Sequence, residues 1–217
     1  MRMLTIWLCA ASFLLSGRVE CTAQTADTPP PSVFQQLFPK PTGQNGFEDL
    51  VMAGELARSS ARLTKTFEAG ATLTDKRAAL DDPDVRRALL LVRQGLAKPI
   101  VNGLSANDGL TFSVFSVLRN LARLLAVEQY VLLADGKVSA AIDSLRDGLR
   151  IGYIVQSEKL VGSLVGVAID SIVLNALARR LDQLSARDCE KVMALAQEWL
   201  RSPDPAITAL PQSECPS

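Results

Sequence analysis

The sequence predicts an all-α fold of about six helices, stacked as antiparallel helical hairpins. Apolar side chains recur every three or four residues along most of the chain, as they do on one face of a helix. No stretch sustains the alternation of apolar and polar residues that is typical of strands. Of the 217 residues, 48% are hydrophobic, which is enough for the core of one domain.

Residues 1–23 predict a secretory signal peptide. Arg2 supplies a positive charge, and the apolar run from Leu4 to Leu15 has the length of a signal-peptide core. Small residues at Cys21 and Ala23 fit cleavage after Ala23. The run is shorter than the ~20 apolar residues of a membrane span. We therefore expect the mature protein to be exported, to the periplasm or the extracellular space.

The sequence after the signal peptide predicts a spacer, a helical domain and a tail. Residues 24–46 include three consecutive prolines from Pro29 to Pro31, so we interpret them as a Pro-rich disordered spacer. Apolar residues then recur at helical spacing, and we expect the helical domain to cover residues 47–202. Residues 203–217 are expected to form a flexible tail, because Pro203 ends the last helix.

Start and stop signals place the helices within this domain. The acidic residue and proline at Asp82-Pro83 predict a helix that begins there and stops before Pro99. The helices expected after it cover residues 111–134, 138–157, 160–184 and 186–200. A short break at Asp135-Gly136-Lys137 separates the first two of these four, so they should form an αα-hairpin.

This hairpin resembles a tetratricopeptide (TPR) repeat. In GKVSAAIDSLRDGLRI, Gly136 stands at the turn, Ala141 and Leu145 at packing positions, and Gly148 where the helices approach closely. The resemblance covers about one repeat, and the first helix departs from the usual pattern, whereas TPR solenoids need about three units. It therefore implies stacked helical hairpins of a TPR-like kind.

The order of the elements also resembles that of uncharacterised exported bacterial helical proteins. The similar segments are GFEDLVMAGEL, ALLLVRQGL, FSVLRNLARLLA and LVGSLVGVAID. Together they extend over most of the expected mature chain. Because these segments are packing patterns, the resemblance implies export and a helical fold but no known activity.

Four glycines predict a close contact between two helices. Two lie on each side of a turn that we expect near residues 157–159. Glycine costs about 1 kcal/mol of helix propensity relative to alanine, so four of them need a packing reason. If the chain reverses at the turn, the glycines face one another and let the backbones approach. These helix-contact glycines are Gly148, Gly152, Gly162 and Gly166.

Asp170 is the one charged residue between positions 160 and 178. A carboxylate in such apolar surroundings must be solvated, neutral or paired. One side of the preceding long helix carries Arg119, Arg123 and Tyr130. We expect Asp170 to form a structural ion pair with Arg119 or Arg123. The alternative is that these four residues line a binding cleft.

The same segment allows a different interpretation, a membrane-associated helix at residues 160–178. Its length is close to that of a membrane span. However, Asp170 lies near the centre, where insertion of a charge costs about 2.5–3.5 kcal/mol. The expected helix also continues into Arg179 and Arg180 without a boundary. We therefore predict a buried helix of a soluble domain and disfavour a membrane span.

The sequence lacks the residues that several kinds of chemistry need. The chain contains no histidine, which excludes His-based triads and His zinc ligands. It has no glycine-rich phosphate loop, GxSxG motif or CxxC motif. Lys+Arg and Asp+Glu are equal at 23 each, so the charge predicts no nucleic-acid partner. Glu48, Asp49 and Glu55 are interpreted as a solvated helix face. We expect no cofactor and no bound metal.

Cys189 and Cys215 would remain after removal of the signal peptide. In an oxidising compartment these two residues are candidates for a disulfide that ties the tail to the last helix. Two unpaired thiols are the alternative, because the sequence alone does not supply the geometry that a disulfide requires.

The function that we expect is that of an exported helical module that binds a protein or a peptide, without catalytic activity. Stacked helical hairpins commonly present a groove to a partner helix or an extended peptide. One alternative is a small-ligand binder or an enzyme with a cleft around Asp170, Arg119 and Arg123. A second alternative is membrane association through residues 160–178.

Overall fold

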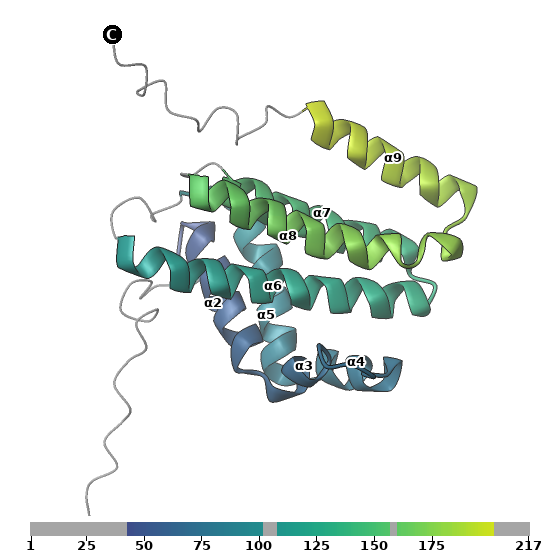
Figure 1. Ribbon diagram of the computed structural model, residues 1–217, viewed down its shortest axis with the longest axis horizontal. Coiled ribbons are helices and arrows are strands. Elements are labelled where there is room, and N and C mark those ends of the chain that lie inside the picture. Colours follow the sequence, from purple (N-terminus) through teal and green to yellow (C-terminus); the bar gives the residue numbers. More distant parts are fainter. Residues whose placement is uncertain (1–42, 102–107, 157–159, 202–217) are drawn as a thin grey trace, which may run out of the picture. The chain divides into compact units, whose positions relative to one another are not determined.

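The computed structural model describes residues 43–101, 108–156 and 160–201 (Figure 1). The chain divides into two units, residues 1–32 and residues 33–217, and all described helices belong to the second. The described part contains 8 α-helices and no strand, so the predicted all-α fold is confirmed. The expected signal peptide, most of the spacer and the tail lie outside the described residues.

Eight α-helices and one short 3-10 helix make up the described part. The α-helices are α2 Gly46–Ser59, α3 Ala61–Lys65, α4 Leu73–Leu80, α5 Pro83–Leu96, α6 Asp108–Ala134, α7 Val138–Gln156, α8 Leu160–Ala178 and α9 Ala186–Arg201. The 3-10 helix is η2 Leu181–Gln183.

Side-chain caps explain where several helices begin. The Asp82 side chain accepts a hydrogen bond from the backbone N–H of Asp84, and Pro83 occupies the first turn of α5, as the sequence predicts. Helix α4 begins at a capping box in which Thr72 and Asp75 bond reciprocally to each other's backbone. Our sequence interpretation did not include α3 or α4, although the Thr72–Asp75 spacing is a signal for the start of a helix.

Helices α6, α7 and α8 lie side by side (Figure 1). Gly136 has a φ of 72°, a left-handed conformation that suits glycine, and it turns the chain between α6 and α7. Helices α2 and α5 form a second pair, and α2 also packs against α6. The N–H of Gly46 donates to the carbonyl of Pro99 at 2.9 Å, which joins the start of α2 to the segment after α5. The hairpin stacking that we predicted is therefore present.

The expected helix over residues 160–184 is too long, because α8 ends at Ala178. Arg180 leaves the helical conformation, with φ −136° and ψ 18°, and η2 follows it. The guanidinium of Arg180 lies over the ring of Tyr130, 4.0 Å from the ring centroid. This cation–π contact with α6 lies two residues beyond the end of α8. No glycine or proline marks the end in the sequence.

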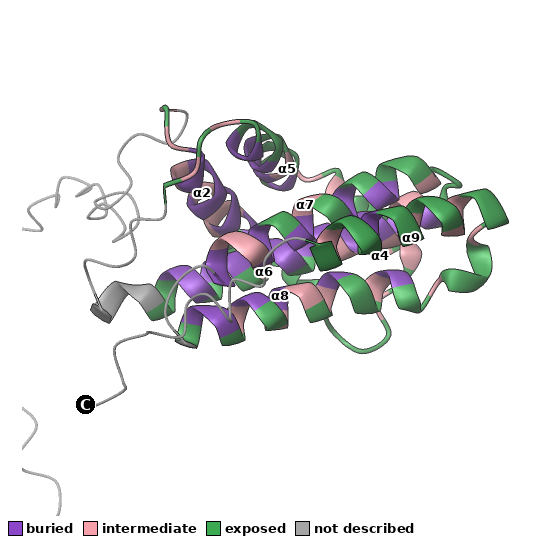
Figure 2. Ribbon diagram, turned by 90° about the horizontal axis from the view of Figure 1, so that it is seen from above, coloured by how far each residue is buried: buried purple, intermediate pink, exposed green. Residues whose placement is uncertain are grey.

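The core gathers around α6, which packs against α2, α4, α7 and α8. Apolar side chains from seven helices are fully buried there. The largest are Phe47, Leu50, Leu63, Leu118, Leu121, Leu124, Leu125, Leu145, Ile151 and Ile169, and Ala79 and Val85 are also fully buried. In contrast, many residues of α9 and one side of α8 are exposed (Figure 2). Helices α8 and α9 therefore contribute much of the exposed surface of the described part.

Candidate binding surfaces

Asp170 lies at the contact between α7 and α8, and its partner is an amide. The Oδ2 atom of Asp170 accepts a hydrogen bond of 2.7 Å from Nε2 of Gln156. Its Oδ1 atom is buried and has no hydrogen-bond partner among the described residues. The predicted ion pair between Asp170 and Arg119 or Arg123 is therefore wrong: the structure places Asp170 against α7.

Burial determines the charge state of this carboxyl group. Desolvation raises the pKa of Asp170 to about 7, and the hydrogen bond from Gln156 opposes part of that increase. Among the described residues, no basic side chain forms an ion pair with it. Near neutral pH, Asp170 is thus divided between a neutral and an ionised form.

Three of the four predicted glycines lie where another helix comes close. A Cβ atom at Gly152 would overlap Oδ1 of Asp170 and lie 3.2 Å from the carbonyl oxygen of Gly166. A Cβ atom at Gly166 would lie 2.6 Å from the carbonyl oxygen of Gly152, and one at Gly148 would lie 2.5 Å from Cγ1 of Val173. Gly162 is buried in α8. Helices α7 and α8 therefore touch through their backbones beside Asp170.

The other predicted binding residues have separate surroundings. Arg119 is exposed on α6. Arg123 donates to Oδ1 of Asn120 at 3.3 Å, and its guanidinium lies 5.7 Å from the centroid of the Phe67 ring. Tyr130 stacks with Arg180, as described above, and Lys76 Nζ lies 5.2 Å from its ring centroid. The structure does not join these residues and Asp170 into one cleft, so that alternative is not supported.

Sequence reasoning missed a polar cluster where α5, α6 and α7 meet. The two carboxylate oxygens of Glu128 each accept a bond of 2.8 Å from Arg93, and Oε2 also accepts one of 2.9 Å from Ser144. Burial raises the pKa of Asp147 nearby, against the influence of the Arg93 charge. Because these contacts join positions far apart in the sequence, spacing alone could not reveal them. The cluster holds three helices in register.

Asp49 corrects the interpretation of the first helix as a solvated acidic face. Its side chain is fully buried and forms an ion pair with Lys98. The neighbouring acids Glu48 and Glu55 are only partly exposed. The signal missed in the sequence was the position of Asp49 directly before the buried pair Leu50 and Val51. The ion pair connects α2 to the end of α5.

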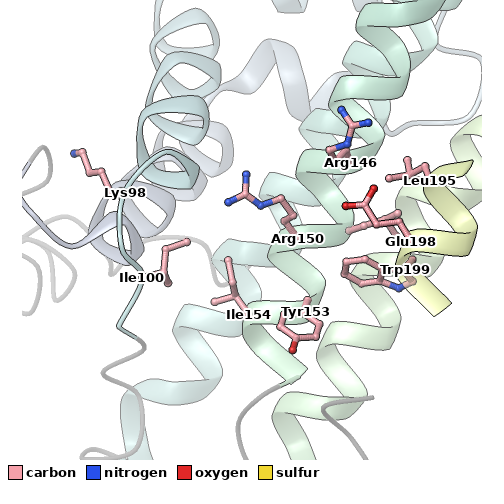
Figure 3. Close-up of a pocket in the computed structure, with 10 residues that line it drawn as sticks. Lys98, Ile100, Arg146, Arg150, Tyr153, Ile154, Leu195, Glu198 and Trp199 are labelled. Carbon is pink, nitrogen blue, oxygen red and sulfur yellow. The ribbon is translucent and has the colours of Figure 1, made fainter. Parts of the chain in front are cut away.

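A cavity of about 410 Å³ lies between α7, α9 and the segment after α5 (Figure 3). Its lining combines apolar and aromatic side chains with three basic residues and one acid. These residues are Lys98, Ile100, Arg146, Leu149, Arg150, Tyr153, Ile154, Leu195, Glu198 and Trp199. The rings of Tyr153 and Trp199 meet edge to face, with centroids 5.7 Å apart. Nothing in the sequence analysis singled out this cavity, because its walls come from distant segments.

The outer face of α8 is an exposed apolar surface, which we define by Val161, Leu164, Val167, Ser171 and Leu174. Leu164 is 64% exposed and Val167 is 53% exposed. The hydroxyl of Ser171 donates to the carbonyl of Val167 at 2.8 Å. Among the described residues, α8 alone is long and apolar enough to cross a membrane, over Val161–Ala178.

The part of the chain that the structure describes shows neither a metal site nor a disulfide. That part has no group of three or more Cys, Asp or Glu side chains that could hold a metal ion. Cys189 is half-buried in α9. Cys215 lies outside the described residues, so the expected disulfide stays a prediction.

Comparisons with known proteins found no match to a family model, to a curated protein or to a solved structure.

Proposed function

We propose that this protein is an interaction module that binds a helix of a partner protein on the outer face of α8. The observation that carries the proposal is the row of exposed apolar residues on a helix that is held by α6 and α7. Exposed apolar surface of this kind is typical of interaction sites, because burying it in a complex is favourable by about 25 cal/mol per Å².

The spacing of the outer face of α8 suits a partner helix. Leu164, Val167, Ser171 and Leu174 follow one another at intervals of three, four and three residues. Two helices that pack along such a row interlock their side chains, as in a coiled coil. The partner would therefore present its own apolar row at the same spacing.

The polarity of the outer face of α8 also favours a helix over a polar ligand. Asp170, the one charged residue of the window from 161 to 178, turns toward α7. The hydroxyl of Ser171 is already satisfied by Val167. A partner helix could therefore cover this face without leaving a charge or an unpaired hydroxyl buried, which would oppose binding.

The sequence expectations agree with this proposal. The resemblance of one hairpin to a TPR repeat would imply a scaffold that other helices can extend, and the expected signal peptide would imply a partner in an exported compartment. We propose no catalytic activity for the module.

The test is recovery of the partner with the protein, tagged at its C-terminus, from the exported fraction of its native host, without detergent. One protein should copurify in near-equal amount, and the double variant Leu164→Gln/Leu174→Gln should lose it. The matched control Met193→Gln/Leu200→Gln changes two exposed apolar residues of α9 and should retain it. A partner retained by the α8 variant would contradict the proposal, as would a chain that emerges alone.

Membrane association is a second candidate, favoured by the hydropathy of α8. It predicts that the protein sediments with phosphatidylcholine vesicles and that Leu164→Gln/Leu174→Gln abolishes this binding, while no protein copurifies. Resistance of the bound chain to alkaline extraction would indicate insertion, which the single carboxyl group at Asp170 disfavours.

A further inference from the structure

The cavity between α7 and α9 is lined in part by apolar side chains, against which a small molecule could pack. Among the residues that line it, Leu149 and Leu195 are buried, while Tyr153, Ile154 and Trp199 are partly exposed. The volume of about 410 Å³ lies in the range of small-ligand sites. The edge-to-face pair of Tyr153 and Trp199 joins α7 to α9 and contributes aromatic rings to the lining (Figure 3).

The basic residues of the cavity differ in how their charges are balanced. Lys98 forms an ion pair with Asp49, and Arg146 forms one of 2.9 Å with Asp143. In contrast, Nη2 of Arg150 donates a hydrogen bond of 2.7 Å to the backbone carbonyl of Leu96, at the end of α5. Its guanidinium is therefore held in place by a neutral group and keeps its other donors, Nε and Nη1, without a partner among the described residues.

Arg150 is the basic residue of the lining whose side chain donates its hydrogen bond to a neutral group. The acid of the lining, Glu198, comes from the opposite helix α9 (Figure 3). Asp147 is one helical turn before Arg150; burial raises the pKa of its carboxyl group, and the charges of Arg93 and Arg150 oppose that increase. An arginine with a fixed plane and open donors is suited to bind a carboxylate through two parallel hydrogen bonds.

We propose that this cavity binds a small organic acid with an apolar body, its carboxylate on Arg150 and its body against Tyr153 and Trp199. This site uses other residues than the outer face of α8, so it is independent of the proposed helix partner. The ligand class is a hydrophobic monocarboxylate of aromatic or branched aliphatic kind.

The test compares two probes, 4-phenylbutyrate and its uncharged amide, 4-phenylbutyramide. Their binding to the full-length protein is measured by ligand-observed NMR titration. The acid should bind about tenfold more tightly than the amide, because only the acid forms a charged pair with Arg150. Trp199→Ala should weaken both probes, since it removes apolar wall from each complex.

Substitutions in the cavity test whether the preference for the acid depends on Arg150. Arg150→Gln should reduce the affinity for the acid to that of the amide and leave the amide unchanged, whereas Arg150→Lys should keep part of the preference. The control Arg119→Gln should behave like the parent protein, because Arg119 is exposed on α6 and does not line the cavity. Leu164→Gln/Leu174→Gln should also bind both probes normally, which separates this site from the outer face of α8.

Three results would overturn the proposal. They are an absence of binding by both probes at millimolar concentration, equal affinity for acid and amide in the parent protein, and an equal loss in Arg119→Gln and Arg150→Gln. The first two of these results come from the parent protein and require no variant. Circular dichroism and binding of the amide test whether Arg150→Gln is folded. If it is not folded, the relative affinities of acid and amide in Arg150→Lys and in the parent protein decide whether Arg150 binds the carboxylate.

Discussion

At the scale of single residues, Asp170 is the most unusual group in the described part of the chain. It is a carboxyl group with one neutral hydrogen-bond donor, Gln156, and one buried oxygen without a partner. Such a group is more stable in its neutral form, because ionisation in apolar surroundings is unfavourable. Folding therefore raises its affinity for a proton.

This linkage predicts that the protein becomes less stable as the pH increases from about 4 to about 7. In that window the folded state, with a pKa of about 7 at Asp170, holds a proton that the unfolded state, with a value of 3.8, has released. The free energy of unfolding should fall by about 1 to 2 kcal/mol after allowance for partial exposure. Urea titrations followed by circular dichroism at several pH values would measure this.

The variant that isolates this effect is Asp170→Asn, which keeps the shape and removes the titration. Above pH 7 it should be more stable than the parent protein, and the dependence on pH between 4 and 7 should become flatter. An unchanged slope would show that another group is responsible, for which Asp147 is the first candidate because burial raises its pKa too.

At the scale of helices, the contact between α7 and α8 depends on backbone approach at Gly152 and Gly166. Gly152→Ala would improve helix propensity by about 1 kcal/mol, but the added methyl group would overlap Asp170 and approach the Gly166 carbonyl. We expect a net loss of about 1 to 3 kcal/mol, as is usual for overpacking. Thermal and urea unfolding would measure it.

A double-mutant cycle supplies the control for this contact. Gly152→Ala combined with Asp170→Ala should cost less than the sum of the two single changes, because the shorter side chain makes room for the methyl group. Gly136→Ala is a matched glycine change in which no atom lies within 4 Å of the added Cβ, so its cost should come from its φ of 72° alone. Additive effects at 152 and 170 would contradict the described contact.

Most helices were predictable because their signals are local. The α5 start at Asp82-Pro83 and the break at Gly136 agree with the sequence interpretation. The end of α8 was not predictable, because it coincides with a contact between Arg180 and Tyr130 on another helix. The sequence also marked Asp170 as exceptional, but its partner depends on how α7 and α8 meet.

At the scale of the whole molecule, stability should be unevenly distributed. Helix α6 packs on four other helices, whereas α9 packs mainly on α7 and Leu195 is its one fully buried residue among those described. Local unfolding requires less free energy where fewer apolar contacts are lost. The described part should therefore combine a rigid group of helices, α6 to α8, with a more loosely held α9.

Hydrogen exchange would measure this difference. Backbone amides of α9 should exchange at least about tenfold faster than those of α6 under native conditions, because α9 can open without disturbing the core. The α7–α9 cavity would open in the same event, so 4-phenylbutyrate should slow exchange in α9 and leave α6 unchanged. Equal protection of the two helices would show that α9 unfolds only with the rest of the molecule.

The backbone contact at Gly152 also has a consequence for how this sequence can vary. Position 152 accepts no side chain while position 170 carries a carboxyl group directed at it. A lineage could replace Asp170 with a smaller residue first and Gly152 afterwards, whereas the reverse order would pass through a destabilised intermediate. Related sequences with a side chain at position 152 should therefore also have a smaller residue at position 170, and the change at position 170 should have come first.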